Sequence, residues 1–413
     1  MLFVYRFLIN LILIISPIVL IYRLFNKKED PLRFKEKYCF FSEKKRRGQL
    51  VWFHGASVGE ILSVIPLIEK LESNKKISQI LVTSNTLSSS KIIQKYKFKK
   101  LTHQFFPIDV NFLSKKFLDY WQPSSAFFID SEIWPNTIYN LKKKNIPIIL
   151  LNARITKKTF NKWMVFSKFA NQIFNQLSLC LSSNNESKKF LQKLGAKKIR
   201  LIGNLKFSQF ENDKILISKE LKKFINSRRT WCASSTHETE EIFCGQVHKE
   251  LKRKYKNLLT IIIPRHIERI KKIEKDLKIL GLKIHFDEPK KKINRETDIY
   301  IVNSYGKTKS FYNNCKNIFL GGSIINHGGQ NPLEATRFGC NIVHGPNISN
   351  FKDIYKFLKQ EKISIQINNQ KQMIRTIIKF FNKTSSPYKM RKKFNLMGQK
   401  ILKLTYGEIK SYF

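Results

Sequence analysis

The sequence predicts an α/β protein with two parallel-sheet domains that follow an N-terminal membrane helix. Short apolar runs of strand length alternate with amphipathic helical runs, the pattern of βαβ units whose sheet is buried on both faces. This alternation pauses at a polar stretch near residues 203–229 and then resumes, and an apolar segment opens the chain. We therefore expect an anchor at 1–25, one domain at 26–205, a linker at 206–228 and a second domain at 229–413, whose last helix can pack back on the first domain.

The N-terminal segment Phe7–Tyr22 is apolar and lies between Arg6 and Arg23. Together with its apolar neighbours it approaches the roughly 20 residues that span a bilayer. Basic residues rather than a small-residue cleavage site follow it, which favours an uncleaved anchor. The positive-inside rule then places the rest of the chain in the cytoplasm. Asn10 and Pro17 weaken a clean span, so a helix that lies in the membrane interface is the alternative.

Apolar runs rich in β-branched and aromatic residues predict the strands. They are 49–53, 79–83, 125–129, 147–151 and 179–182 in the first domain, and 230–234, 258–264, 282–286, 299–302, 317–320 and 341–344 in the second. Helices are expected at Ile61–Leu71, whose apolar residues share one face, and at 371–381 and 388–412. Ligands bind beyond the carboxyl ends of strands in open parallel sheets, so the segments that follow the strands are the candidate sites.

The chain has 413 residues, with 77 Lys and Arg against 30 Asp and Glu, which gives a formal net charge of +47. Its apolar content of 42% excludes bulk disorder. A basic excess suits nucleic acid, an anionic membrane or an acidic substrate, but its spread along the chain favours genome composition as the main cause. The six cysteines and eight histidines show no metal-ligand spacing, so we expect a reducing compartment and no metal site.

The first candidate site is the segment HGASVGE at 54–60, directly after a predicted strand. Its glycines, Gly59 among them, allow a ligand to approach the backbone. Glu60 falls in the first turn of the next helix, where a carboxylate can act as a general base toward a hydroxyl. Ser57 and Glu60 also have the spacing of a capping box, and this structural role is the alternative.

Two further segments follow strands of the first domain. Asp130, Glu132 and Asn136 lie in the segment DSEIWPN, where polar groups gather at a strand end. The alternative there is simple initiation of a helix at Pro135. Arg154 follows the next strand and is either solvated or placed to orient the acidic residues or bind an anion.

Strand ends of the second domain carry residues typical of anion sites. Ser235 precedes a helix in the segment SSTHETEE, where free backbone N–H groups can bind an anion, although Ser235 and Glu238 also have capping-box spacing. Arg265 and His266 follow the apolar run at 258–263, and a guanidinium there suits phosphate or carboxylate recognition.

The segment GGSIINHGGQNPLE at 321–334 is the most informative one. Gly322, Ser323 and Asn331 lie in this glycine-rich loop, which leads into a helix near Glu334. Such loops cradle phosphates at helix N-termini, and a glutamate one turn into the helix can bond ribose hydroxyls. The spacing matches neither the dinucleotide fingerprint nor the P-loop. A plain connecting loop is the alternative, but it leaves the paired glycines unexplained.

Taken together, these segments resemble the Kdo transferases, a family that adds 3-deoxy-D-manno-octulosonic acid (Kdo) to the lipid A precursor of Gram-negative envelopes. The matching segments occur in the family's order and are HGASVGE (54–60), FIDSEIWPN (128–136), NARIT (152–156), GNLKF (203–207), SSTHETEE (234–241), PRHIER (264–269) and GGSIINHGGQNPLEA (321–335). The resemblance extends from the anchor to at least Phe351.

The resemblance implies a glycosyltransferase B-type architecture, in which two Rossmann-like domains face a cleft. It implies that the N-terminal domain receives the lipid acceptor, lipid IVA, and that Glu60 is the catalytic base. The C-terminal domain would bind the donor CMP-Kdo through Arg265, His266 and the loop at 321–334, with Lys206 stabilising the donor phosphate. The other first-domain residues named above would bind the acceptor or shape the site.

The reaction expected from this resemblance is an inverting, metal-independent displacement at the anomeric carbon of Kdo, without a cofactor or an obligate protein partner. It would take place on the cytoplasmic face of the inner membrane. Basic residues at 23–37 and 44–47 would hold the protein to its anionic lipid.

Three positions depart from the family's usual residues, with Asp130 in place of Glu, Gln330 in place of His and Ala335 in place of Pro. The loss of a possible cation at Gln330 bears on donor affinity rather than on the reaction class. The rival functions are another two-domain sugar-nucleotide enzyme, such as a heptosyltransferase or an epimerase, a basic nucleic-acid-binding protein, and a non-catalytic lipid-binding relative. An epimerase needs no anchor, so the apolar N-terminal segment counts against that enzyme. The aromatic residues form no recognisable RNA-binding motif, which counts against a nucleic-acid-binding protein. The presence of Glu60 and Arg265 counts against a non-catalytic relative.

Overall fold

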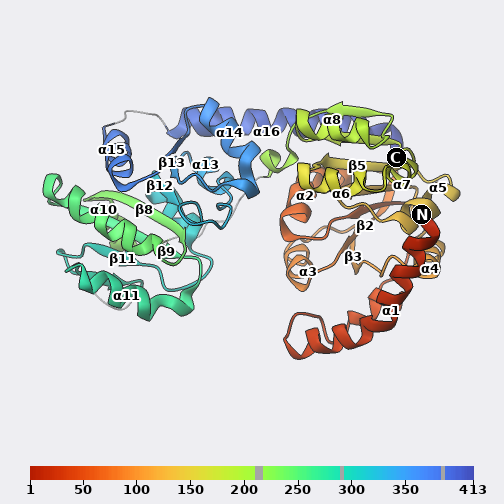
Figure 1. The fold of residues 1–413 in the computed structure, drawn as a ribbon, viewed down its shortest axis with the longest axis horizontal. Helices are drawn as coiled ribbons and strands as arrows, with labels where there is room; N and C mark the ends of the chain where they lie inside the picture. The colour runs from red at the N-terminus through yellow and green to blue at the C-terminus, as the bar shows by residue number, and fades with distance from the viewer. Residues whose placement is uncertain (210–216, 289–292, 383–386) are drawn as a thin grey trace. The chain divides into compact units, whose positions relative to one another are not determined.

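The computed structural model describes residues 1–209, 217–288, 293–382 and 387–413. Its tertiary contacts divide the chain into two compact units (Figure 1). Unit 1 comprises Met1–Phe210 and Met397–Phe413, and unit 2 comprises Glu211–Leu396. The two α/β units that the alternating pattern predicts are therefore present.

Unit 1 is built on a parallel sheet with the strand order β3-β2-β1-β4-β5-β6-β7. Its strands are β1 (Gln49–His54), β2 (Ile77–Ser84), β3 (Leu101–Phe105), β4 (Ser125–Ile129), β5 (Ile148–Ala153), β6 (Leu179–Ser182) and β7 (Ile199–Leu201). Its helices are α1 (Leu2–Phe25), α2 (Val58–Glu72), α3 (Leu87–Ile93), α4 (Asn111–Trp121), α5 (Pro135–Lys143), α6 (Lys157–Met164), α7 (Ser167–Phe174) and α8 (Asn185–Lys193), with the short 3-10 helices η1 (Phe34–Tyr38) and η2 (Leu205–Ser208).

The centre of the unit 1 sheet is buried on both faces, as a parallel sheet requires. Every residue of β4 and of β5 is buried, and Trp52 of β1 packs against Phe117 and Phe128 with ring centroids 4.9 and 5.3 Å apart. The strand order reverses between β1 and β4. Ligands of doubly wound sheets bind at such a switch point, so the segments that follow β1 and β4 are in the position expected of a site.

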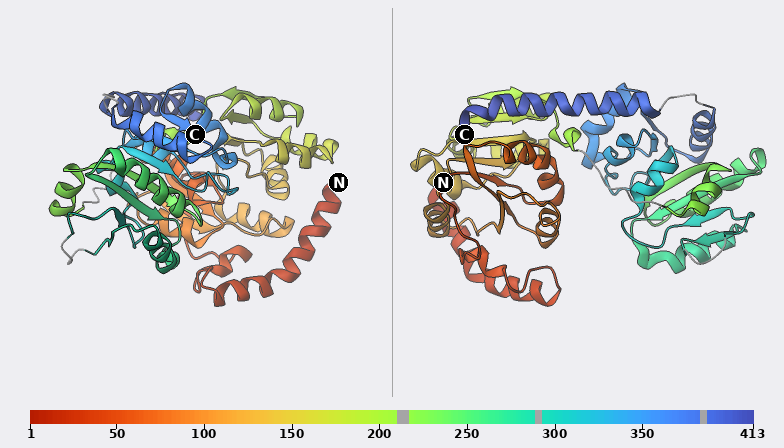
Figure 2. Two further views of the ribbon diagram at one scale, coloured as in Figure 1. Left: turned by 60° about the vertical axis from the view of Figure 1, so that its left-hand side comes forward. Right: turned by 180° about the vertical axis from the view of Figure 1, so that it is seen from behind.

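Helix α1 is long and apolar enough to cross a membrane, by length and composition alone. Its N-terminal half packs against the core of unit 1 through Leu2, Tyr5, Ile9 and Leu13, which are partly buried (Figures 1 and 2). Most of its other apolar side chains are exposed, and Phe3 reaches 82% exposure.

Unit 2 has a second parallel sheet, with the strand order β10-β11-β9-β8-β12-β13-β14. Its strands are β8 (Arg229–Thr236), β9 (Leu258–Pro264), β10 (Ile284–Phe286), β11 (Ile299–Ile301), β12 (Asn317–Leu320), β13 (Asn341–His344) and β14 (Ser364–Gln366). Its helices are α9 (Lys219–Asn226), α10 (Glu240–Lys254), α11 (Ile270–Ile279), α12 (Thr308–Asn314), α13 (Leu333–Arg337), α14 (Lys352–Gln360) and α15 (Gln370–Phe381), and α16 (Pro387–Ile409) has residues in both units.

A buried ion-pair cluster lies at the amino-terminal edge of the unit 2 sheet. Asp298, just before β11, pairs with Lys252, lies 3.4 Å from His248 Nε2 and accepts the backbone N–H of Lys283 at 3.0 Å. Burial opposes ionisation of Asp298, but these hydrogen bonds outweigh it and hold its pKa below the usual value. The cluster lies at the opposite edge of the sheet from the glycine-rich loop.

All eleven predicted strands are present, with ends displaced by at most two residues. The strands β3, β7 and β14 were not predicted, and the stretch predicted to be a linker contains helix α9, which buries Leu221 and Ile225. Helix α5 begins at Pro135, so helix initiation in that segment is confirmed.

Candidate active site

The loop after β1 carries Glu60 into the first turn of α2. Gly55 lies in a tight space there, because a Cβ would come within 3.0 Å of the terminal methyl group of Ile129. Ser57 is the N-cap of α2, and its Oγ accepts the Glu60 N–H at 3.4 Å. Glu60 Oε1 accepts the Ser57 hydroxyl and Oε2 accepts the Ala56 N–H, both at 2.7 Å. The capping role is therefore confirmed, and it fixes the carboxylate in place without excluding a chemical role.

Burial raises the pKa of Glu60 from 4.5 to about 7. The hydrogen bond from Ser57 lowers it, whereas the charges of Glu132 and Asp130 raise it further. A carboxyl group with a pKa near neutrality can take and return a proton at physiological pH. Within unit 1 the neighbouring Gly59 is exposed, and a Cβ there would meet no atom within 4 Å.

Asp130 follows β4 and is held by residues from two other segments. Its φ of 56° and that of Asn152, 51°, lie in the left-handed region that non-glycine residues rarely adopt. Asn152 Nδ2 donates to Asp130 Oδ1, and the backbone N–H of Arg154 donates to the Asp130 carbonyl at 3.1 Å. Lys206 Nζ lies 2.7 Å from Asp130 Oδ2. The segments NARIT and GNLKF therefore meet DSEIWPN at the ends of β4 and β5.

The position of Lys206 bears on the role that the sequence predicts for it. It lies in unit 1 on η2, and its ammonium group forms an ion pair with Asp130. The N–H of Leu205 donates to Asn152 Oδ1 at 2.7 Å, which fixes the turn that carries Lys206. Contact with a donor phosphate remains a prediction for this residue.

Glu132 belongs to a hydrogen-bonded cluster at the same end of the sheet. Its Oε2 lies 3.3 Å from His54 Nε2 and accepts the indole N–H of Trp134 at 3.0 Å. His54 Nδ1 lies 2.9 Å from Thr83 Oγ1, which also accepts the indole N–H of Trp52 at 2.9 Å. Groups from β1, β2 and the loop before α5 thus orient this carboxylate.

Asn136 lies in the first turn of α5 and is fully buried. Its backbone N–H donates to Asp109 Oδ2 at 3.0 Å, and its Oδ1 accepts the guanidinium of Arg6 at 2.9 Å. Asp109 Oδ1 accepts the N–H of Thr137 at 2.9 Å, and Oδ2 accepts the hydroxyl of Tyr5 at 2.8 Å. Burial raises the pKa of Asp109 to about 6, although its hydrogen bonds act in the opposite direction. No sequence motif marks Asp109, so its role was not predicted.

In unit 2, Ser235 lies near the end of β8, where its φ of 55° is left-handed and the register with β9 shifts. Helix α10 begins at Glu240, and Glu238 is exposed and pairs with Lys272. A capping box between Ser235 and Glu238 is therefore wrong, because the chain makes a further turn before the helix begins.

Arg265 and His266 follow β9, the neighbour of β8, and both are exposed. The ring of His237 lies 4.1 Å from that of His327 and 5.7 Å from that of His266. Burial, followed by the neighbouring histidines and arginines, lowers the pKa of His237 to about 4, so it is neutral at pH 7. Its Nε2 can then accept the amide of Gln330, 3.1 Å away. The exposed guanidinium beside this cluster suits an anionic ligand.

The glycine-rich loop of unit 2 is held by Glu240, which lies in the segment SSTHETEE but had no predicted role of its own. The carboxylate of Glu240 is fully buried and accepts four backbone N–H groups. Those of His237 and Gly322 bind Oε2 at 2.9 and 2.7 Å, and those of Ser323 and Ile324 bind Oε1 at 3.1 and 3.0 Å. Backbone groups of Gly322 and Ser323 that the sequence assigns to a phosphate are thus engaged by a carboxylate.

The remaining predicted residues of this loop have different surroundings. Ser323 is fully buried, and its Oγ accepts the N–H of Gly345 at 2.8 Å. Asn331 is exposed, and its Oδ1 accepts the N–H of Leu333 at 3.1 Å where α13 begins. Glu334 lies half-buried in the first turn of α13. Asn331 and Glu334 are therefore nearer to the surface than Gly322 and Ser323.

Comparison with known proteins gives concordant sequence matches. The sequence model of the 3-deoxy-D-manno-octulosonic-acid transferases (kdotransferases) matches residues 32–209. The chain is 35% identical over 350 residues to a 3-deoxy-D-manno-octulosonic acid transferase of Rickettsia prowazekii, covering 84% of this chain and 75% of that protein. It is 28% identical over 368 residues to the protein of the same name from Haemophilus influenzae, covering 87% and 86%.

Solved structures share the fold at low sequence identity. A putative UDP-N-acetylglucosamine 2-epimerase from Listeria monocytogenes matches with a TM-score of 0.60 at 13% identity, covering 88% of this chain and 97% of that one. The UDP-GlcNAc 2-epimerase from Neisseria meningitidis bound to UDP-GlcNAc matches with a TM-score of 0.59 at 12% identity, covering 88% and 100%. These likenesses establish the arrangement of strands and helices and carry no information on substrate.

Proposed function

Because the chain belongs to the family of 3-deoxy-D-manno-octulosonic acid (Kdo) transferases, we propose that it transfers Kdo from CMP-Kdo to the lipid A precursor lipid IVA. It is a glycosyltransferase of lipopolysaccharide biosynthesis. The observation that carries the finer proposal is Glu60, a carboxylate fixed at the switch point of the unit 1 sheet whose pKa is raised to about 7.

In the proposed reaction, Glu60 accepts the proton of the 6′-hydroxyl of the acceptor as the hydroxyl oxygen attacks the anomeric carbon of Kdo. The new bond joins that oxygen to the anomeric carbon, and the bond from this carbon to the phosphate oxygen of CMP breaks. The electron pair of the broken bond leaves with CMP, and Glu60 later returns the proton to solvent. Attack opposite the leaving group inverts the configuration at the anomeric carbon.

The charges near Glu60 support its role as a base. Glu132 and Asp130 raise its pKa and so increase its basicity. Lys206 neutralises Asp130 at 2.7 Å, which limits the repulsion that an anionic substrate would meet. The proposal needs no metal, because side chains and backbone groups supply the charge that the transition state requires.

We assign donor recognition to unit 2. The exposed Arg265 and His266 suit the phosphate of CMP, and Glu334 suits ribose hydroxyls. The carboxylate of Glu240 accepts the backbone N–H groups of Gly322 and Ser323. These groups therefore contribute by fixing the conformation of the loop rather than by direct contact with the donor.

Helix α1 and the charges near it support the proposed acceptor and location. The exposed apolar side of α1 suits the lipid of the inner membrane, and the basic residues after it suit anionic headgroups on the cytoplasmic face. CMP-Kdo and lipid IVA, with anionic membrane lipid, are the partners of this proposal, which requires neither a cofactor nor a second protein.

The test incubates the purified full chain with CMP-Kdo and tetraacylated lipid IVA in detergent micelles, with and without EDTA, and weighs the lipid by mass spectrometry. We expect a gain of Kdo mass that EDTA does not reduce. An unchanged lipid mass with intact donor would overturn the assignment, and transfer from a UDP-sugar instead would favour the rival class of sugar-nucleotide enzyme. Stronger retention on RNA than on lipid IVA at matched salt would favour a nucleic-acid-binding protein.

A further inference from the structure

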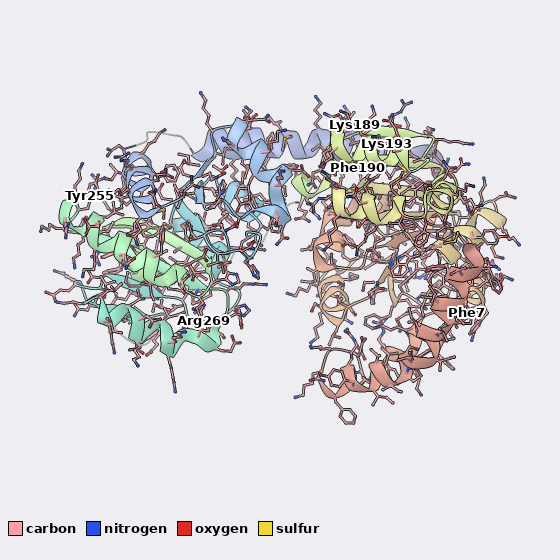
Figure 3. The ribbon with its side chains drawn as sticks, in the orientation of Figure 1. Phe7, Lys189, Phe190, Lys193, Tyr255 and Arg269 are labelled. Carbon is pink, nitrogen blue, oxygen red and sulfur yellow. The ribbon has the colours of Figure 1, made fainter. Side chains whose placement is uncertain are left out.

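Helix α1 has two chemically different faces. Its inner face carries Tyr5, Arg6 and Ser16, which form hydrogen bonds to the rest of unit 1. Its outer face carries exposed apolar side chains such as Phe3 and Phe7, and Figure 3 shows Phe7 extending from the ribbon of α1. An apolar anchor alone would not need the polar bonds of the inner face.

The hydrogen bonds of Tyr5 and Arg6 connect the inner face of α1 to the start of α5. The first N–H groups of a helix have no partner within it, and Trp134, the N-cap of α5, provides no side-chain cap. Asp109 supplies the cap instead, since it accepts the N–H groups of Asn136 at 3.0 Å and of Thr137 at 2.9 Å. The hydroxyl of Tyr5 donates to the same carboxylate at 2.8 Å, so α1 helps to hold this cap.

Arg6 makes the second connection from α1 to the same place. Its Nε donates to Asn136 Oδ1 at 2.9 Å, and its second guanidinium nitrogen donates to Asn111 Oδ1 at 3.1 Å. The guanidinium also lies 5.1 Å from the ring centroid of Tyr139. Arg6 therefore joins α1 to the first residues of both α4 and α5.

The start of α5 is directly connected to Glu132. Trp134 precedes Pro135, and its indole N–H lies 3.0 Å from Glu132 Oε2 and 3.1 Å from His54 Nε2. A displacement of the start of α5 would move Trp134 and release the carboxylate that it orients. Glu132 and Asp130 both raise the pKa of Glu60, so a displacement of Glu132 would lower the pKa of the proposed base.

Both ends of α1 are fastened to unit 1. Near its carboxyl end, Arg23 pairs with the buried Glu29 at 2.6 Å, and Lys37 of η1 pairs with the same carboxylate at 2.7 Å. Glu36 of η1 accepts the backbone N–H of Phe105 in β3 at 2.7 Å. A helix held at both ends by one folded unit lies along that unit, so its outer face would enter a single leaflet.

We infer that α1 has two separable functions. Its outer face binds anionic lipid in the membrane interface, and Tyr5 and Arg6 on its inner face are positioning residues that hold the start of α5 and, through it, Glu132. The catalytic part of this inference rests on the proposed function, whereas the structural part does not.

The inner face is tested with the substitutions Tyr5→Phe and Arg6→Gln in the full chain. Tyr5→Phe removes a hydrogen bond to Asp109, the cap of α5, and Arg6→Gln removes the guanidinium that binds Asn136. We therefore expect hydrogen exchange of the amides at 136–139 to become about tenfold faster while the rest of unit 1 keeps its protection. Tyr22→Phe is the matched control, because Tyr22 lies exposed on the same helix, and it should leave these amides unchanged.

Kdo transfer in detergent micelles supplies the catalytic measurement. We expect kcat of Tyr5→Phe to fall about three- to tenfold with KM for CMP-Kdo unchanged. The acid limb of its pH–rate profile should move to lower pH, because Glu132 no longer raises the pKa of Glu60 as strongly. The charged groups that bear on Glu60 are Glu132, Asp130 and, through Asp130, Lys206.

The outer face is tested by co-sedimentation with phosphatidylglycerol vesicles. The double substitution Phe3→Ser and Phe7→Ser removes two large apolar side chains and should weaken vesicle binding more than tenfold. It should leave exchange at 136–139 unchanged, whereas Tyr5→Phe should leave vesicle binding unchanged.

Unchanged exchange at 136–139 in both inner-face variants would overturn the positioning role. Full vesicle binding by the outer-face variant, or equal loss of both properties in every variant, would overturn the separation of the two faces. Absence of Kdo transfer by the natural chain would refute the proposed function instead, and the exchange and vesicle measurements would still decide the structural part.

Discussion

Replacing Glu60 by Gln separates the chemical role of this residue from its structural one. The substitution keeps the size of the side chain and one acceptor oxygen but removes the negative charge. In the natural chain Oε1 accepts the Ser57 hydroxyl and Oε2 accepts the Ala56 N–H. A glutamine can satisfy one of these donors, and capping boxes accept either residue.

The expected magnitudes differ widely between stability and rate. Loss of one hydrogen bond costs about 1 kcal/mol. Removal of the partly desolvated charge offsets this cost. The rise of the Glu60 pKa from 4.5 to about 7 corresponds to a penalty of at most about 3 kcal/mol for carrying this charge in the folded chain, and partial exposure reduces that penalty. General-base catalysis by contrast is worth about 100- to 10,000-fold in rate. We therefore expect a folded variant that is nearly inactive.

The stability of the variant should also have a defined pH dependence. The pKa of Glu60 is higher in the folded state, so ionisation disfavours folding, and the natural chain loses stability as pH rises from about 4.5 to 7. Glu60→Gln lacks this loss. Its stability relative to the natural chain should therefore increase across that interval and level off above pH 7.

The assay measures initial rates of Kdo transfer to lipid IVA at saturating CMP-Kdo between pH 5.5 and 8.5. The natural chain should reach a plateau above pH 7 and be about tenfold slower one pH unit below the pKa of Glu60. Circular dichroism and urea unfolding verify that the variant is folded. A folded Glu60→Gln variant within threefold of the natural rate would refute the assignment of Glu60 as the base.

Three further results are expected. Ser57→Ala should cost about 1 kcal/mol in urea unfolding and move the midpoint of the pH–rate profile upward, because the Ser57 hydroxyl lowers the pKa of Glu60; an unmoved midpoint would contradict their coupling. Glu240→Gln should raise KM for CMP-Kdo at least tenfold, since buried loop N–H groups left without an acceptor cost about 1–3 kcal/mol each, and an unchanged KM would show that the loop does not contact the donor. Asp298→Asn should cost about 3 kcal/mol at pH 7, with Glu296→Gln on the exposed surface as the control. Because the pKa of Asp298 is lowered in the folded chain, this contribution should begin to decline below about pH 4, where the unfolded carboxyl is protonated, and should be lost only when the folded carboxyl is protonated as well.

The candidate site of unit 1 was predictable where polar residues follow strongly apolar strands. Glu60, Asp130 and Arg154 follow β1, β4 and β5, which are neighbours in the sheet, and parallel topology brings the ends of these strands together. Asp109 was not predictable, because its partners Asn136 and Tyr5 lie 27 and 104 positions away in sequence. Only the folded chain shows that one aspartate caps a helix that it does not belong to.

The strands that were not predicted share a physical reason. β3 reads LTHQF, and its Thr102, His103 and Gln104 are buried polar residues with hydrogen-bond partners, so apolar patterning cannot reveal it. β7 and β14 have three residues each and lie at sheet edges, where one neighbouring strand provides all of the pairing. Such elements depend on their neighbours more than on their own sequence.

Two glycines in and beside the glycine-rich loop of unit 2 have a structural explanation that the sequence alone does not reveal. A Cβ at Gly321 would lie 2.4 Å from the Ser235 carbonyl oxygen and 2.8 Å from Glu240 Oε2, and one at Gly345 would lie 2.2 Å from the Ser323 carbonyl oxygen. These glycines permit the close approach of backbone to backbone around a buried carboxylate. Gly321 and Gly345 are thus explained by packing inside unit 2, whereas Asn331 of the same loop is exposed.

Both predicted sites contain non-glycine residues in the left-handed backbone conformation. Among the described residues, nine non-glycine residues have positive φ, and Asp130, Asn152, Ser235 and Thr239 are four of them. Such conformations cost about 1–3 kcal/mol each and persist only where the surroundings enforce them.

At the end of β4 the enforcing contacts are the bonds of Asp130 to Asn152 and Lys206. Aspartate and asparagine tolerate the left-handed region better than most residues because their short side chains bond locally. An aspartate at position 130, where the family usually has glutamate, therefore suits this turn and still reaches Lys206. The departure leaves the ion pair beside Glu60 intact, which is why we expect the reaction class to be unchanged.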